Sequence, residues 1–298
     1  MNPAADRRAI PTYLLLTWAA SCLFYFLIIK SKGTNAAAGA YTTGLMWCPA
    51  LGAMLTCKLL GRPIASLGWK WGRTRYQVVS YLIPLGYSTF TYSIAWLTGI
   101  AALNPIQTAD AFSRFLGLGP ISKPFGIGLF FLIVATVGVV ENCATTLGEE
   151  IGWRGFLVPE LAKRYSFTAT AVISGIIWAL WHVPIIVFAG YNADTGWYGL
   201  AVVSANMIGL CFVLTWLRLK SGSLWTGVIL HASSNHFIQH FFDPMTAYTG
   251  RTKYIMGEFG IAFTVVVAVI AAYFWMRRAE VAQALSPTME ARPLSTMP

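Results

Sequence analysis

Charged residues are scarce in this chain. Asp, Glu, Lys and Arg together account for 11% of its 298 residues, whereas about 25% is typical of a soluble domain. With 56% of the residues hydrophobic, a chain of this length could not cover its apolar surface with polar groups in water. The composition therefore excludes an ordinary soluble domain and predicts an integral membrane protein.

Acidic residues and cysteines are also few. The chain has 11 acidic and 21 basic residues, a net charge of +10, and five cysteines. Its Lys and Arg residues are spread over the ends of apolar segments and form no single stripe interleaved with aromatic residues, so we expect no nucleic-acid partner. Membrane lipids with anionic headgroups account for them better. Cysteines that are odd in number and widely spaced predict neither a disulfide framework nor a metal site.

Long apolar runs predict an all-α fold, a polytopic membrane bundle of about eight transmembrane helices. Each run approaches the 20 or so residues that cross a bilayer as a helix. Pro49, Gly52 and several polar residues interrupt the second and seventh runs. The eight runs are Tyr13 to Ile29, Tyr41 to Leu60, Tyr76 to Leu103, Phe125 to Leu147, Ala169 to Phe188, Trp197 to Leu217, Leu224 to Phe242 and Phe259 to Met276.

The distribution of basic residues predicts that both termini face the cytoplasm. Cytoplasmic loops carry an excess of Lys and Arg, and in this arrangement all but six of the 21 basic residues lie on the inner side. We expect a cytoplasmic segment over residues 1–12, a transmembrane domain over 13–278 and a disordered tail over 279–298. The outer loop over 104–123 shows no strong periodicity. We place the protein in the cytoplasmic (inner) membrane of a bacterium.

Three charged residues follow shortly after the fourth run, at the inner end of this span. An ionisable residue near the centre of a span costs at least ~2.5 kcal/mol, so by default it faces a cavity and has a function. Glu150 and Arg154 are four residues apart and can pair on one helix face, which leaves Glu149 free for another role. The structural alternative is a solvated charge cluster in the inner loop.

Two further polar motifs lie in the fifth and seventh runs. His182 follows Trp178 by one helical turn, and His231 and Asn235 share one helix face. Each motif has a structural alternative: a neutral histidine bonded to a backbone carbonyl, or hydrogen bonding between packed spans. Three polar insertions in so apolar a chain favour a shared polar pocket.

Together the three motifs resemble those of the CPBP family, membrane peptidases that include the CAAX prenyl endopeptidases and the bacterial Abi-type proteins. The run from Glu149 to Arg154 and the pair His231 and Asn235 fit the family pattern as they stand. Trp178 stands where Phe is usual, with His182 in register. The resemblance covers a peptidase-like core over about 125–242.

The resemblance implies an intramembrane endopeptidase. Its substrate would be a membrane-associated protein or peptide, with prenylated CAAX-type proteins as one class. Glu149 would act as general base on a water held with His182. His231 and Asn235 would donate hydrogen bonds to the oxyanion, and the Glu150–Arg154 pair would orient the site.

A metal-dependent version of the site uses the same residues. Glu149, His182 and His231 could hold zinc, with water as the fourth ligand. The chain has no HExxH helix, so we favour a glutamate-activated water without a metal and keep zinc as the alternative.

Other readings of the same residues also stand. A non-catalytic membrane binding or immunity protein could keep this fold, and a transporter could use the acidic residues and His182 as a proton relay. His236 and His240 could extend a metal site, but their place near the outer end of the seventh run favours an interfacial or packing role. Glu141, two turns before Glu149, could line the same cavity.

Overall fold

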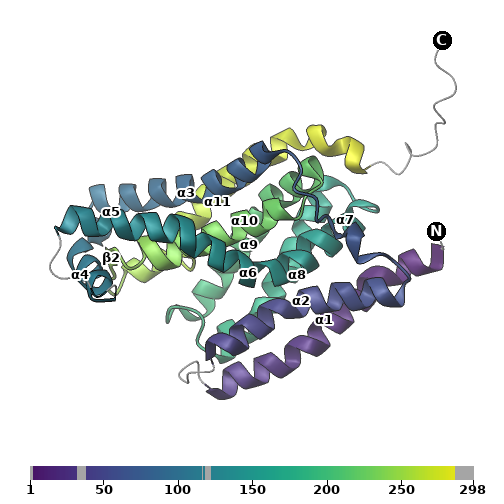
Figure 1. Cartoon of the computed structure of the whole chain (residues 1–298), viewed down its shortest axis with the longest axis horizontal. Coiled ribbons are helices and arrows are strands. Elements are labelled where there is room, and N and C mark those ends of the chain that lie inside the picture. The colour runs from purple at the N-terminus through teal and green to yellow at the C-terminus, as the bar shows by residue number, and fades with distance from the viewer. Residues whose placement is uncertain (1–2, 32–37, 116, 118–121, 286–298) are drawn as a thin grey trace, which may run out of the picture.

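The computed structural model describes residues 3–31, 38–115, 117 and 122–285, and this part of the chain is almost entirely helical (Figure 1). The α-helices are α1 Pro3–Ser31, α2 Ala38–Leu59, α3 Thr74–Leu97, α4 Pro105–Phe115, α5 Lys123–Ile133, α6 Val139–Glu150, α7 Val158–Ala162, α8 Phe167–Phe188, α9 Gly196–Ser221, α10 Trp225–Asn235 and α11 Ile261–Met276. Three π-helical segments, η2 Val134–Gly138, η3 Ile151–Leu157 and η4 His236–Phe242, continue longer helices. Short 3₁₀ helices are η1 Ile64–Leu67, η5 Thr252–Tyr254 and η6 Arg277–Leu285.

All eight predicted runs are helical over most of their length, which confirms the all-α bundle. Among the described residues, five helices are long and apolar enough to cross a membrane: Arg8–Ser31, Lys123–Ala162, Phe167–Phe188, Gly196–Ser221 and Ile261–Ala282. The runs that form α2, α3 and α10 are not among the five, because Thr, Ser, Tyr, Gln, His and Asn lower their mean hydropathy. The count of eight spans and their orientation stay predictions.

Helix α9 lies at the centre of the bundle and packs against α8, α10 and α11. Of the five apolar helices it has the most buried spanning segment. Helices α1 and α2 form a hairpin against α6 and α8 (Figure 1). A Cβ atom at Gly148 would lie 2.6 Å from the backbone oxygen of Met46. The bare glycine therefore lets α2 approach the end of α6 that carries the acidic motif.

Two π-helical segments follow the polar motifs directly. η3 begins one residue after Glu150, and η4 begins one residue after Asn235. π turns inside α-helices are rare and occur frequently at functional sites. In η3 the widened turn carries Trp153 and Arg154, whose side chains bond back to Glu149 and Glu150 at the end of α6.

The two ends of the described chain lie at one end of the bundle, where α1 starts and η6 finishes (Figure 1). At the opposite end, β1 Ala102–Leu103 pairs antiparallel with β2 Thr246–Ala247, next to α4. The first part of the predicted tail, residues 279–285, belongs to the 3₁₀ helix η6. Residues 286–298 lie outside the described part. Helix α1 already begins at Pro3, within the predicted N-terminal segment.

Candidate functional site

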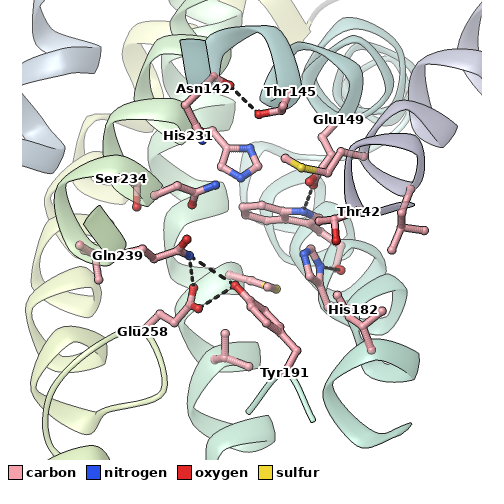
Figure 2. A pocket seen from close by; sticks show the side chains of 18 of the residues that line it. Thr42, Asn142, Thr145, Glu149, His182, Tyr191, His231, Ser234, Gln239 and Glu258 are labelled. Carbon is pink, nitrogen blue, oxygen red and sulfur yellow. Dashed lines mark hydrogen bonds between the residues drawn. The ribbon is translucent and has the colours of Figure 1, made fainter. Parts of the chain in front are cut away.

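The three polar motifs line one cavity of about 680 Å³. Glu149 comes from α6, His182 from α8, and His231 and Asn235 from α10 (Figure 2). These residues are separated by up to 86 positions in the chain, so only packing of the three helices brings them together. The shared pocket expected from the three polar insertions is therefore present.

Glu149 is held by two indole groups. Its Oε2 atom accepts a hydrogen bond of 2.8 Å from Nε1 of Trp178 and one of 3.2 Å from Nε1 of Trp153. The residue is only 2% exposed, and none of the salt bridges in the described part of the chain includes it. Two N–H donors thus hold Oε2 in place, and no salt bridge of the described chain occupies this carboxylate.

Glu150 lies behind the cavity wall in a buried network. Its Oε1 atom is 2.8 Å from Nη1 of Arg154, the pair that the four-residue spacing predicts, and 3.0 Å from Nδ1 of His231. All three side chains are buried. Gly227 makes room for this carboxylate, because a Cβ atom there would lie 2.4 Å from Oε2 of Glu150. The pair thus orients one of the histidines of the cavity.

Hydrogen bonds at Nδ1 fix the tautomer of each histidine. Nδ1 of His182 is 3.0 Å from the backbone oxygen of Trp178, and a carbonyl oxygen can only accept, so Nδ1 carries a hydrogen. Nδ1 of His231 likewise faces the carboxylate of Glu150. When either ring is neutral, its Nε2 atom therefore keeps a lone pair for a group in the cavity.

Trp178 contacts Glu149 and both histidines of the cavity. In addition to its bond to Glu149, its ring lies 5.2 Å from that of His231 and 5.9 Å from that of His182, both edge to face. The guanidinium of Arg154 lies over the ring of Trp178, 4.5 Å from the ring centre. In the sequence, Trp178 stood out only as a departure from the usual Phe. The indole N–H donors of Trp178 and Trp153 were not predicted. The four-residue spacing from Glu149 to Trp153 was the available signal.

A second polar cluster lies on the cavity wall opposite Glu149 (Figure 2). The hydroxyl of Tyr191 donates to Oε1 of Glu258 at 2.7 Å, and Nε2 of Gln239 donates to Oε2 at 3.3 Å. Burial raises the pKa of the Glu258 carboxyl, and the hydrogen bond from Tyr191 opposes that rise. These residues come from three separate segments, so no motif in the sequence pointed to them.

The side chains as placed do not form a metal site. Within the described ranges, no group of three or more His, Cys, Asp or Glu residues could hold a metal ion. Glu149, His182 and His231 share the cavity without forming such a group. The zinc alternative stays a prediction, and the water activation proposed below uses the protein's own groups.

The remaining candidates lie toward the edge of the site. His236 and His240 stack on each other, with ring centres 4.4 Å apart and ring planes 29° apart. His240 lines the cavity and His236 packs against Gly138. Glu141 is exposed and does not belong to the described cavity lining.

The part of the chain that contains the three motifs is similar to known proteins. Residues 124–237 match the family described as type II CAAX prenyl endopeptidase Rce1-like. CAAX prenyl protease 2 from Methanococcus maripaludis is 34% identical over 162 residues, which cover 53% of this chain and 54% of the relative. The chain thus spans about half the length of the curated relative that it matches. Residues 124–237, which contain all three motifs, are thus the part of this integral membrane protein that is similar to the Rce1-like CAAX prenyl endopeptidases.

Proposed function

We propose that the protein is an intramembrane endopeptidase that hydrolyses a peptide bond of a membrane-associated protein. One observation carries the proposal: a buried carboxylate without a cationic partner, Glu149, shares a cavity with His182, His231 and Asn235. A binding pocket alone would not need a carboxylate kept ready to accept a proton.

Glu149 acts as the general base. A water in the cavity donates one hydrogen to the carboxylate and a second to Nε2 of His182, whose lone pair is set by the bond at Nδ1. The water oxygen then attacks the peptide carbonyl carbon while its proton moves to Glu149. The same proton passes to the amine nitrogen when the C–N bond breaks, so Glu149 serves first as base and then as acid.

Asn235 and His231 stabilise the oxyanion that forms on the peptide oxygen. The Asn235 amide donates from Nδ2. His231 donates from Nε2 only when both of its ring nitrogens carry hydrogens, and Glu150 supports that form by accepting from Nδ1. Each donor to an oxyanion is typically worth ~3 kcal/mol of transition-state stabilisation.

The substrate class follows from the relative's name and the site's setting. A relative called CAAX prenyl protease 2 supports a prenylated, CAAX-type C-terminal segment as substrate. The cavity wall combines the polar groups above with apolar side chains such as Ile185, Met207 and Leu230, which suits a peptide attached to a lipid. We place the enzyme in the cytoplasmic membrane of a bacterium.

The test is cleavage of farnesylated and plain CAAX peptides by the purified full chain in detergent. Glu149→Gln keeps the size of the side chain and removes the base, so we expect the rate to fall by at least ~10²-fold. The matched control is Glu141→Gln, an exposed carboxylate on the same helix outside the described cavity lining, which should keep full activity.

A chelator arm separates the two versions of the chemistry. Activity that persists in chelator and disappears in Glu149→Gln supports the glutamate-activated water. Loss in chelator with recovery on adding zinc supports the metal version instead. If the folded wild-type protein binds these peptides and cleaves none of them, the non-catalytic binding protein replaces the enzyme.

A further inference from the structure

A second cavity of about 770 Å³ lies between α3, α9, α11 and η6. One end has three cationic side chains, Arg75, Lys220 and Arg277, together with the carboxylate of Glu280. The rest of its described lining is mainly apolar and aromatic: Tyr76, Val79, Leu82, Ile83, Gly86, Tyr87, Trp216, Ile270, Tyr273 and Phe274. An apolar groove with a positively charged end has the chemistry of a binding site for an anionic amphiphile.

The positive end has more charge than its own carboxylate can neutralise. Glu280 accepts hydrogen bonds from Nε and Nη2 of Arg277 and lies 3.4 Å from Nζ of Lys220. Arg75 is outside the salt bridges of the described chain, and its guanidinium donates to the hydroxyl of Tyr76. The described side chains at this end thus leave an excess of two positive charges, which a phosphate group can balance.

The length of the groove matches one leaflet of a bilayer. Along α3 the lining runs from Arg75 to Tyr87, twelve residues that rise about 18 Å. Half of the hydrocarbon core of a bilayer is about 15 Å thick. A lipid with its phosphate at Arg75 would therefore reach Tyr87 with the end of one acyl chain.

The charged end also lies on the side where anionic lipids are concentrated. Arg75 lies in the first turn of α3, Lys220 in the last turn of α9, and Arg277 follows α11 directly. All three lie on the side that the distribution of basic residues predicts to be cytoplasmic. The cytoplasmic leaflet carries the negative surface potential of a membrane.

We propose that this groove binds one anionic phospholipid of the cytoplasmic leaflet, with its phosphate between Arg75, Lys220 and Arg277 and an acyl chain along α3 and α11. The site is independent of the proposed peptidase chemistry. Its far end nevertheless borders the catalytic cavity, since the hydroxyl of Tyr87 donates to Oγ of Ser234 at 2.6 Å and Ser234 lines that cavity.

The test measures which phospholipids stay with the full chain after purification from mixed micelles. The micelles contain equal amounts of phosphatidylglycerol and phosphatidylcholine with the same acyl chains, and mass spectrometry counts the retained lipids. The wild-type protein should retain phosphatidylglycerol over phosphatidylcholine by about tenfold. Arg75→Gln combined with Lys220→Gln should abolish the preference, and Glu280→Gln, which removes the competing carboxylate, should increase it.

A groove-filling variant tests the apolar part. Gly86 lines the groove, and a Cβ atom there would meet nothing within 4 Å, so Gly86→Phe should fit the fold and displace the acyl chain. Gly128 has the same open surroundings on α5, away from the groove, and Gly128→Phe is the matched control. Retention of phosphatidylglycerol should fall several-fold in the first variant only.

Three results would overturn the proposal. The wild-type protein could retain both lipids equally, or Gly86→Phe could retain phosphatidylglycerol like the wild type. In the third, Gly86→Phe would lose binding of a farnesylated peptide while lipid retention stays unchanged, which would make the groove a substrate site.

Discussion

At the scale of the residue, Trp178 has the widest set of contacts in the site. Its N–H donates to Glu149, and its ring lies against His182, His231 and Arg154. A hydrogen bond to a charged group contributes about 1.5–3 kcal/mol. The indole therefore does more than fill the space that a Phe would fill, because it also holds the carboxylate of Glu149, the proposed general base.

Trp178→Phe should lower kcat by about tenfold or more, because it removes the 2.8 Å donor to Glu149 and keeps an aromatic ring. The substrate contacts stay, so KM should change little. Cleavage kinetics of the purified variant check this. Trp275→Phe is the control, since that indole donates to Thr168 far from the cavity. Wild-type kcat in Trp178→Phe would mean that Trp153 alone is a sufficient donor.

The sequence predicted the members of this site better than their contacts. Four-residue spacing identified the Glu150–Arg154 pair, because a helix places such residues on one face. It could not predict the bond between Glu150 and His231, which joins residues 81 positions apart. Nor could it find Glu258, whose partners Tyr191 and Gln239 come from other segments. The catalytic roles themselves stay predictions.

At the scale of the element, the apolar runs predicted where the helices lie. The polar residues within some of these runs left the number of membrane spans open. α2, α3 and α10 are helical as expected, yet they are not among the five helices that are apolar enough to span on composition. Several of their polar side chains are buried all the same, among them Ser80, Tyr92 and His231. α4 was not expected, although its sequence is amphipathic, and this helix packs on α5. No sequence pattern predicted the three π-helical segments.

The contact between α2 and α6 gives a prediction about stability. Gly148→Ala would place a Cβ atom 2.6 Å from the backbone oxygen of Met46 and 2.7 Å from Cα of Trp47. Backbone atoms cannot turn aside as a side chain does, so we expect a loss of about 1–3 kcal/mol in the free energy of unfolding. The midpoint of thermal unfolding in detergent measures it.

Gly39→Ala is the control for that measurement, because a Cβ atom at Gly39 meets nothing within 4 Å. Both changes introduce the same methyl group into a helix, so intrinsic helix propensity favours each of them equally. An unchanged midpoint in Gly148→Ala would show that α2 can move away from α6, and that the close packing of the two helices is not required.

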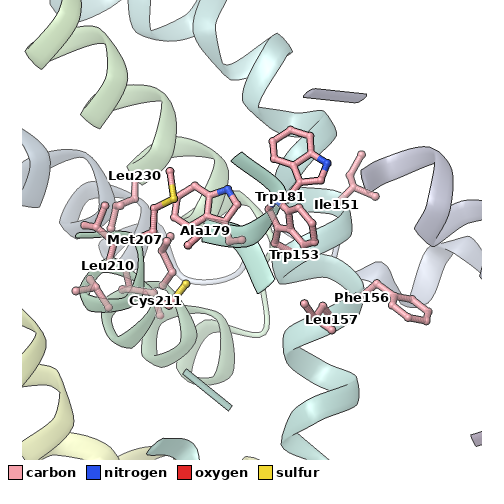
Figure 3. Packing of buried hydrophobic residues seen from close by; sticks show 14 of the residues in the cluster. Ile151, Trp153, Phe156, Leu157, Ala179, Trp181, Met207, Leu210, Cys211 and Leu230 are labelled. Atoms are coloured by element: carbon pink, nitrogen blue, oxygen red, sulfur yellow. The ribbon is translucent and has the colours of Figure 1, made fainter. Parts of the chain in front are cut away.

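At the scale of the whole molecule, the positions of the chain ends and the distribution of charge agree. The described chain begins and finishes at the same end of the bundle (Figure 1), as an even number of crossings requires. Buried apolar and aromatic side chains from η3, α8, α9 and α10 pack together in one cluster (Figure 3). The same packing that hides Trp153 and Trp181 from solvent holds the helices that carry the site.

The orientation itself is testable with single cysteines in the otherwise unchanged chain. All five native cysteines lie within predicted spans, out of reach of a membrane-impermeant maleimide in intact cells. Ser122→Cys and Ser66→Cys each place a thiol at an exposed position, in a loop predicted to be outer and inner respectively. Because basic residues concentrate on the inner side, Ser122→Cys should label in intact cells and Ser66→Cys only after permeabilisation. The reverse result would invert the bundle and place the cationic end of the lipid groove on the outer face.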